Sequence, residues 1–111
     1  MKKVIAIDYD ETITDNTPYP YEGNIRSQAI KYIKLLYDKG YILVLWTSRK
    51  EKDYKKCIDR LQKENILQYF NFDDVEYGYS GKVIADFYID DKSIIGKLNW
   101  RKIYKYIIKN I

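Results

Sequence analysis

The chain has 111 residues, of which 46% are hydrophobic and 32% charged, a composition typical of an ordinary soluble globular protein. This length is enough for one domain with its own core, and we expect residues 1–111 to form that single domain. No apolar run approaches the roughly 20 residues of a membrane-spanning helix, so we expect no membrane partner. The single cysteine, and the lack of an apolar signal segment after Met1, predict a cytoplasmic protein.

The sequence contains no histidine. That absence excludes Ser-His-Asp and Cys-His nucleophile systems, and zinc sites built on histidine. Acid–base chemistry near neutral pH must then come from carboxylates, lysine, tyrosine or a metal-bound water. Cys57 has no histidine to activate it, and we predict that it packs on the buried side of a helix.

The net charge of +4 is unevenly distributed along the chain. Residues 1–91 carry 14 basic and 16 acidic side chains, a net charge of −2, whereas residues 92–111 carry 6 basic side chains and no acidic one, a net charge of +6. Two interpretations stay open for this basic end. It is either a solvated helix face or an electrostatic guide for a polyanionic substrate.

The first expected element is a strand that leads into two carboxylates. Residues 4–7 (VIAI) are typical of a buried strand in a parallel sheet, and Asp8 and Asp10 follow directly. Side chains two residues apart on a strand point the same way, so both carboxylates can face one small volume. Adjacent carboxylates repel each other, and a hard cation such as Mg²⁺ is the natural counterion. Taken alone, the segment is equally well interpreted as a solvated acidic turn.

A loop, a helix and a second strand are expected next. Residues 13–23 include two prolines and a glycine, which predicts a loop or a small hairpin. Helical spacing of apolar residues predicts a helix over 25–39, which Gly40 would end. The apolar run 41–46 (YILVLW) predicts the second buried strand.

The second strand ends at Thr47, and Ser48 with Glu51 has the spacing of a capping box. The next helix would then begin directly after Thr47. Its free N–H groups and the positive end of its dipole would point toward the strand ends, an arrangement that suits phosphate.

The second half of the chain is expected to complete a parallel sheet. Segments 70–72 and 75–77 each have the composition of a short strand, 83–89 that of the last buried strand, and 97–109 that of a final helix. Alternating strands and helices predict an α/β fold with a parallel sheet and right-handed crossovers.

Polar residues of complementary kinds follow three of these strands. Asp8 and Asp10 follow the first strand, Thr47 the second, and the pair Asp90 and Asp91 the last, with Lys82 just before it. In open α/β sheets, ligands bind beyond the carboxyl ends of the strands. A carboxylate nucleophile, an acid–base partner, a metal and donors to phosphate oxygens are the groups that phosphoryl transfer requires.

These segments resemble the signature motifs of one superfamily. Residues 8–12 (DYDET) resemble the DxDxT motif of the haloacid-dehalogenase-like phosphotransferases, 43–47 (LVLWT) their second motif, and 89–91 (IDD) the DD form of their fourth. The chain is most similar to small capless members from bacteria and phages. The resemblance implies a three-layer Rossmann-like sheet of about four strands in the order 3-2-1-4, without a cap domain.

The resemblance also implies a role for each matching residue. Asp8 would attack phosphorus and form an aspartyl-phosphate, and Asp10 would act as the acid and base. Phosphate oxygens would be bound by Thr47, with Ser48 beside it, and by a lysine. That lysine would be Lys82, with Arg49 and Lys92 as substitutes because Lys82 lies closer to the acidic pair than the family's lysine usually does.

The implied cofactor is Mg²⁺. Its ligands would be Asp8, Asp10 through its main-chain carbonyl, Asp90 and Asp91, with Asp91 the more direct ligand of the last pair. The function implied is a Mg²⁺-dependent phosphomonoester hydrolase. With no room for a cap, the site would be open, which suits a large phosphorylated substrate such as a nucleic-acid end. The sequence leaves the oligomeric state open.

Two other functions are considered. A receiver-like phosphoacceptor domain shares the size, the parallel sheet and the acidic cluster, but would carry its phosphorylated aspartate where this chain has Thr47. A non-enzymatic nucleic-acid-binding module would use the basic C-terminal helix, where Trp100, Tyr104 and Tyr106 are interleaved with basic residues.

Overall fold

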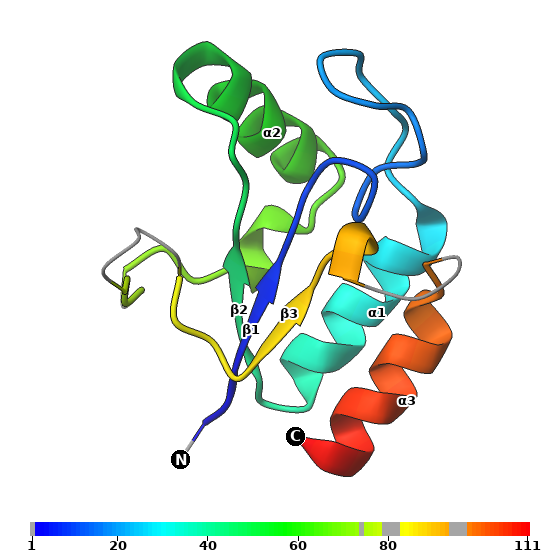
Figure 1. Ribbon diagram of the computed structural model, residues 1–111, viewed down its shortest axis with the longest axis vertical. Coiled ribbons are helices and arrows are strands. Elements are labelled where there is room, and N and C mark those ends of the chain that lie inside the picture. The colour runs from blue at the N-terminus through cyan, green and yellow to red at the C-terminus, as the bar shows by residue number, and fades with distance from the viewer. Residues whose placement is uncertain (1, 74, 79–82, 94–97) are drawn as a thin grey trace.

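The computed structural model describes residues 2–73, 75–78, 83–93 and 98–111. A parallel sheet has the strand order β2-β1-β3 (Figure 1). Its strands are β1 (Val4–Ile7), β2 (Ile42–Leu45) and β3 (Phe87–Ile89). The helices are α1 (Ser27–Asp38), α2 (Glu51–Lys63) and α3 (Trp100–Asn110), with short 3₁₀ helices η1 (Leu67–Tyr69) and η2 (Asp91–Ser93).

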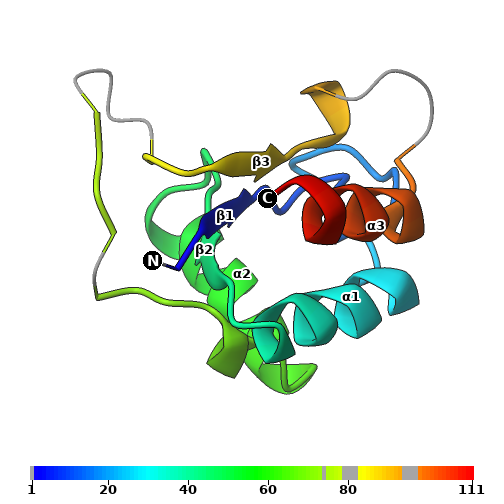
Figure 2. The same cartoon turned by 90° about the horizontal axis from the view of Figure 1, so that it is seen from below.

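The two faces of the sheet are covered differently. The larger core combines side chains from one face of the sheet, such as Ile5 and Leu43, with buried side chains of all three helices, including Ile33, Leu61 and Ile107. The opposite face carries a small cluster built on Ala6, Val44 and Val83, to which no described helix contributes. Figure 2 shows α1 and α3 side by side on one side of the sheet.

The described residues therefore form two layers rather than the three that the resemblance implied. The segment between η1 and β3 forms no helix over its described residues. Its described residues Val75, Val83 and Ala85 lie against the second face instead. Buried β1 and β2 side chains on both faces explain why these strands are continuously apolar.

The fourth strand is not formed among the described residues. At the outer edge of β2, Phe70 makes an isolated parallel bridge with Leu43, and the N–H of Asn71 donates to the Leu43 carbonyl at 2.7 Å. Segment 75–77 likewise contributes one antiparallel bridge, between Tyr77 and Val83. The α/β class and the parallel sheet are confirmed, and the segment expected beside β2 lies there without extending into a strand.

Two helix starts differ from the prediction. α1 begins at Ser27 because the preceding residues close a hairpin, with a bridge between Thr14 and Ile25 and a 2.8 Å hydrogen bond from the Arg26 N–H to the Ile13 carbonyl. α1 ends as expected, just before Gly40, whose φ of 96° favours glycine. α3 begins at Trp100, where the Asn99 side chain accepts a hydrogen bond from the Lys102 N–H.

The predicted capping box is wrong. α2 begins at Glu51, its N-cap is Lys50, and no side chain caps it. The Thr47 hydroxyl instead accepts a 3.2 Å hydrogen bond from the Arg49 N–H, which holds a non-helical turn after β2. That turn directs the Arg49 side chain into the protein, where it is 2% exposed. Among the described residues, no helix is both long and apolar enough to cross a membrane.

Candidate active site

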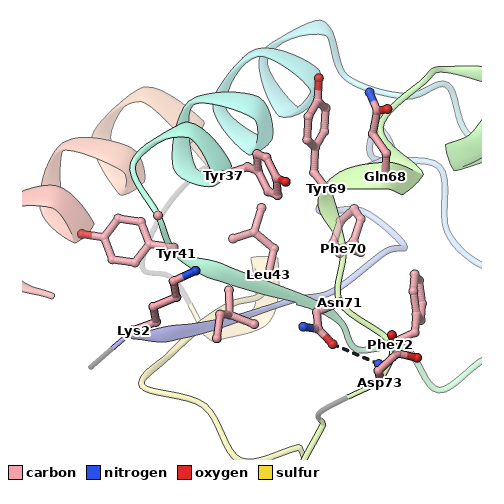
Figure 3. A pocket seen from close by; sticks show the side chains of 12 residues that line it. Lys2, Tyr37, Tyr41, Leu43, Gln68, Tyr69, Phe70, Asn71, Phe72 and Asp73 are labelled. Carbon is pink, nitrogen blue, oxygen red and sulfur yellow. Dashed lines mark hydrogen bonds between the residues drawn. The ribbon is translucent and has the colours of Figure 1, made fainter.

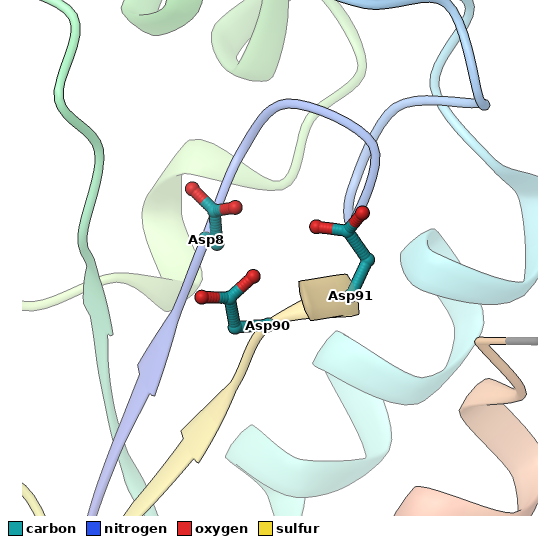
Figure 4. Close-up of side chains that lie close together, drawn as sticks. All are labelled: Asp8, Asp90 and Asp91. Carbon is teal, nitrogen blue, oxygen red and sulfur yellow. The ribbon is translucent and has the colours of Figure 1, made fainter. Parts of the chain in front are cut away.

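Three carboxylates converge at the carboxyl ends of β1 and β3. Ile7 of β1 is paired with Ile89 of β3, so the residues that follow, Asp8 and Asp90, lie side by side. The Asp8 N–H donates to the Ile89 carbonyl at 3.0 Å, which extends the ladder to this position. Asp91 begins η2, and carboxylate oxygens of all three residues lie within 4.8 Å of one another (Figure 4).

Burial and mutual repulsion perturb this cluster. The pKa of Asp8 is raised to about 7, mainly by burial and also by the neighbouring charges of Asp90 and Asp91, against a hydrogen bond from the Tyr9 N–H that lowers it. The pKa of Asp91 is also raised, first by burial and then by its interaction with Asp90. Without a cation, the cluster therefore tends to hold protons near neutral pH, and an added positive charge would stabilise its ionised form.

Thr12 anchors the acidic cluster to the rest of the protein. Its buried hydroxyl accepts a 3.1 Å hydrogen bond from the Asp91 N–H and lies 3.4 Å from the Asp91 carboxylate. Its carbonyl accepts a 3.0 Å hydrogen bond from the indole of Trp100, a buried residue of α3. The threonine that ends the first motif thus links the turn after β1 to both η2 and α3.

Asp10 lies apart from the cluster and pairs with Arg49. The Arg49 Nε and Nη2 donate to the two Asp10 oxygens at 2.8 and 2.7 Å, and Nη1 donates to Glu22 at 2.8 Å. The hydrogen bond from Arg49 to Asp10 is the main cause of the raised pKa of the guanidinium, which stays charged. Sequence reasoning named Arg49 only as a substitute phosphate ligand and missed this pairing, as it missed Glu22 and the contact of Trp100 with Thr12.

The phosphate-binding residues expected from the sequence are only partly placed. Thr47 is half-buried two positions beyond Leu45, which pairs with Ile7, so it stands at the same end of the sheet as Asp8. Ser48 is exposed, and so is Lys92. Lys82 lies outside the described residues.

Two other features do not belong to this site. Cys57 is fully buried on α2, as predicted, and burial raises its pKa to about 12. A cavity of about 590 Å³ runs along the outer edge of β2 and is lined by Tyr37, Tyr41 and Tyr69 among others (Figure 3). It shares no residue with the carboxylate cluster.

Comparison with known proteins gives a consistent assignment. The model of the haloacid dehalogenase-like hydrolase family matches residues 5–110. A solved structure described as a conserved protein from Bacteroides thetaiotaomicron is 28% identical, with a TM-score of 0.82, covering 100% of this chain and 93% of that one. No curated protein matches the chain. This chain is an enzyme of the haloacid dehalogenase-like hydrolase family.

Proposed function

We propose that this hydrolase is a Mg²⁺-dependent phosphomonoester hydrolase that acts through an aspartyl-phosphate on Asp8. The observation that carries the proposal is the convergence of Asp8, Asp90 and Asp91 at the ends of β1 and β3, with ligand atoms within 4.8 Å of one another. This end of a parallel sheet is where α/β proteins bind their ligands.

The carboxylates fit a magnesium ion. They offer only oxygen ligands, which Mg²⁺ prefers, and the raised pKa values of Asp8 and Asp91 reflect burial and crowding that a divalent cation would relieve. Asp8, Asp90 and Asp91 would hold the ion, together with the main-chain carbonyl of Asp10. When bound, Mg²⁺ would supply positive charge that keeps Asp8 ionised and offsets the charge of the phosphoryl group.

The proposed reaction has two steps at the phosphorus atom. An Asp8 carboxylate oxygen bonds to phosphorus while the bond from phosphorus to the leaving oxygen breaks, and Asp10 gives that oxygen a proton. Water then attacks the aspartyl-phosphate, its proton passes to Asp10, and the bond from phosphorus to Asp8 breaks. The products are the alcohol and inorganic phosphate. Thr47 would donate a hydrogen bond to a phosphate oxygen.

The test is phosphate release with and without Mg²⁺ for the wild type and Asp8→Asn. A suitable control is Asp38→Asn, because Asp38 is an exposed α1 residue that pairs with Lys34 on the same helix. The wild type and the control should show turnover that needs Mg²⁺, and Asp8→Asn should show none while still folding. Activity retained in Asp8→Asn would contradict the mechanism.

The substrate is proposed only as a phosphomonoester on a molecule that an uncapped site can admit. The loop after β1 closes as a short hairpin with the Thr14–Ile25 bridge, and the described residues contain no inserted domain over the strand ends. The panel should therefore include aryl phosphates, sugar phosphates, nucleotides and oligonucleotides phosphorylated at either end. Preference for oligonucleotides would support a guiding role for the exposed basic residues of α3.

A further inference from the structure

Arg49 makes the most extensive ion pairing among the described side chains, and phosphoryl transfer at Asp8 does not account for it. Its three guanidinium nitrogens all donate to carboxylates, two to Asp10 and one to Glu22, at 2.7–2.8 Å. Two parallel hydrogen bonds fix both the position and the plane of the Asp10 carboxylate, which a single contact would not do. The arginine side chain is 2% exposed, so water screens these interactions little.

The loop after β1 encloses this guanidinium. The rings of Tyr9 and Tyr19 lie on it, with centroids 5.1 and 4.9 Å from the guanidinium carbon. Glu22, which accepts the hydrogen bond from the third guanidinium nitrogen, lies in the same loop as Tyr19. The guanidinium is therefore held by aromatic rings and by carboxylates, an arrangement that allows it few alternative positions.

The same loop is fastened to α2. The Tyr19 hydroxyl donates to Asp53 at 2.8 Å, and Arg60 donates to the Gly23 carbonyl at 2.9 Å. Arg60 also lies 3.6 Å from Glu22. Contacts thus run without a break from α2, through the loop and Arg49, to the Asp10 carboxylate.

We infer that Arg49 is a positioning residue that fixes the Asp10 carboxylate for proton transfer, with the loop residues Tyr19 and Glu22 holding Arg49 in place. The inference rests on the proposed function, in which Asp10 acts as acid and base. Asp10 needs this support because it follows β1 on a turn, outside the strand ladder that places Asp8. Proton transfer is sensitive to the position of the donor and acceptor atoms.

The test compares Arg49→Met, Asp10→Asn and the double variant. The substrate is an aryl phosphate whose leaving group needs no proton, so Asp8 is still phosphorylated when Asp10 is out of position. Hydrolysis of the aspartyl-phosphate, in contrast, needs a positioned base. The Arg49→Met variant should therefore release the phenol in a burst equal to the enzyme concentration. The steady-state rate that follows should be about 100-fold slower than in the wild type, with KM little changed. Arg49→Lys, which keeps the charge but loses the paired geometry, should recover only part of the rate.

The double variant separates positioning from a general structural role. If Arg49 acts through Asp10, Arg49→Met should lower kcat no further in the Asp10→Asn background. The inference would be overturned if the losses in kcat of the two single variants multiplied in the double variant, or if Arg49→Met kept the wild-type kcat. Either result would leave Mg²⁺-dependent turnover through Asp8 intact. A wild type without turnover would overturn the proposed function and this inference with it.

Removing Arg49 leaves the partly buried Asp10 carboxylate without this partner and Glu22 with Arg60 alone, which can prevent folding. Glu22→Gln avoids that problem because Glu22 is 35% exposed and the pair between Arg49 and Asp10 remains. It should lower kcat several-fold, and again have no effect in the Asp10→Asn background. An equal loss in both backgrounds would overturn the inference.

Discussion

The indole nitrogen of Trp100 donates a 3.0 Å hydrogen bond to the main-chain carbonyl of Thr12, a residue that lies 88 positions earlier in the chain. Both residues are buried. Because the Thr12 hydroxyl also contacts Asp91, this bond joins α3 to the turn that carries the acidic cluster. The final helix is thereby part of the support of the site.

Replacement of Trp100 by Phe should lower the free energy of unfolding by about 1–3 kcal/mol, because the buried Thr12 carbonyl loses its donor and the smaller ring leaves space. Urea denaturation measures the change. The control is Tyr21→Phe at a tyrosine that is 70% exposed, which should stay within about 0.5 kcal/mol of the wild type. Equal stability of Trp100→Phe and the control would contradict the role of this hydrogen bond.

Replacement of Tyr9 by Phe should not lower the free energy of unfolding, in contrast to replacement of Trp100. Its side chain is fully buried, and its hydroxyl has no hydrogen-bond partner among the described residues. Because an unsatisfied buried hydroxyl costs free energy, Tyr9→Phe should be as stable as the wild type or more stable by up to about 1 kcal/mol. The ring that packs on Arg49 is retained. A clear loss in urea denaturation would show that the hydroxyl has a partner.

Stability without metal should depend on pH through Asp8. Its pKa is about 7 in the folded protein and 3.8 ordinarily, so the folded state binds more protons than the unfolded chain between these values. The free energy of unfolding should therefore fall as pH rises from about 4 to about 7, and Asp91 adds to the trend. Since Asp8 is only partly buried, we expect its contribution to be about 1–2 kcal/mol.

Denaturation in the presence of EDTA across this pH range measures the effect. Asp8→Asn should remove most of the slope, whereas Asp38→Asn at the exposed α1 position should keep it. Mg²⁺ should raise Tm more at pH 8 than at pH 5, because protons compete with the ion for the same oxygens. Stability that rises with pH in the wild type would contradict the raised pKa.

Asp91→Asn should weaken Mg²⁺ binding on the order of 10–100-fold, because it removes one charged oxygen ligand from the cluster. The asparagine can still accept the hydrogen bond from Thr12, so the fold should be kept. Isothermal titration with Mg²⁺ measures the affinity, again with Asp38→Asn as the control. An unchanged affinity would remove Asp91 from the metal site.

The sequence predicts the strand ends well because each depends on neighbouring residues. The apolar runs of β1, β2 and β3 and the polar residues after them specify a buried parallel sheet and place Asp8 and Asp90 at the same edge. In the part of the chain that the structure describes, no helix covers the second face. This could not be predicted, because the segment after η1 contains apolar residues that are compatible with strands.

The remainder of the site depends on contacts between distant residues. Arg49 follows Ser48 in a segment whose local pattern favours a helix start, yet its three carboxylate hydrogen bonds hold the chain in a turn. Glu22 and Trp100 lie 27 and 88 positions from Arg49 and Thr12, their respective partners. No local pattern in a single sequence predicts such pairs.

The central claim is that the phosphoryl group is transferred to Asp8. The most direct measurement is mass spectrometry of peptides from enzyme quenched during turnover of an aryl phosphate with Mg²⁺, using Asp10→Asn to slow hydrolysis of the intermediate. A phosphoryl group on Asp8, absent when EDTA is present, is the predicted result. A phosphoryl group on another residue, or none during measurable turnover, would contradict the proposed mechanism.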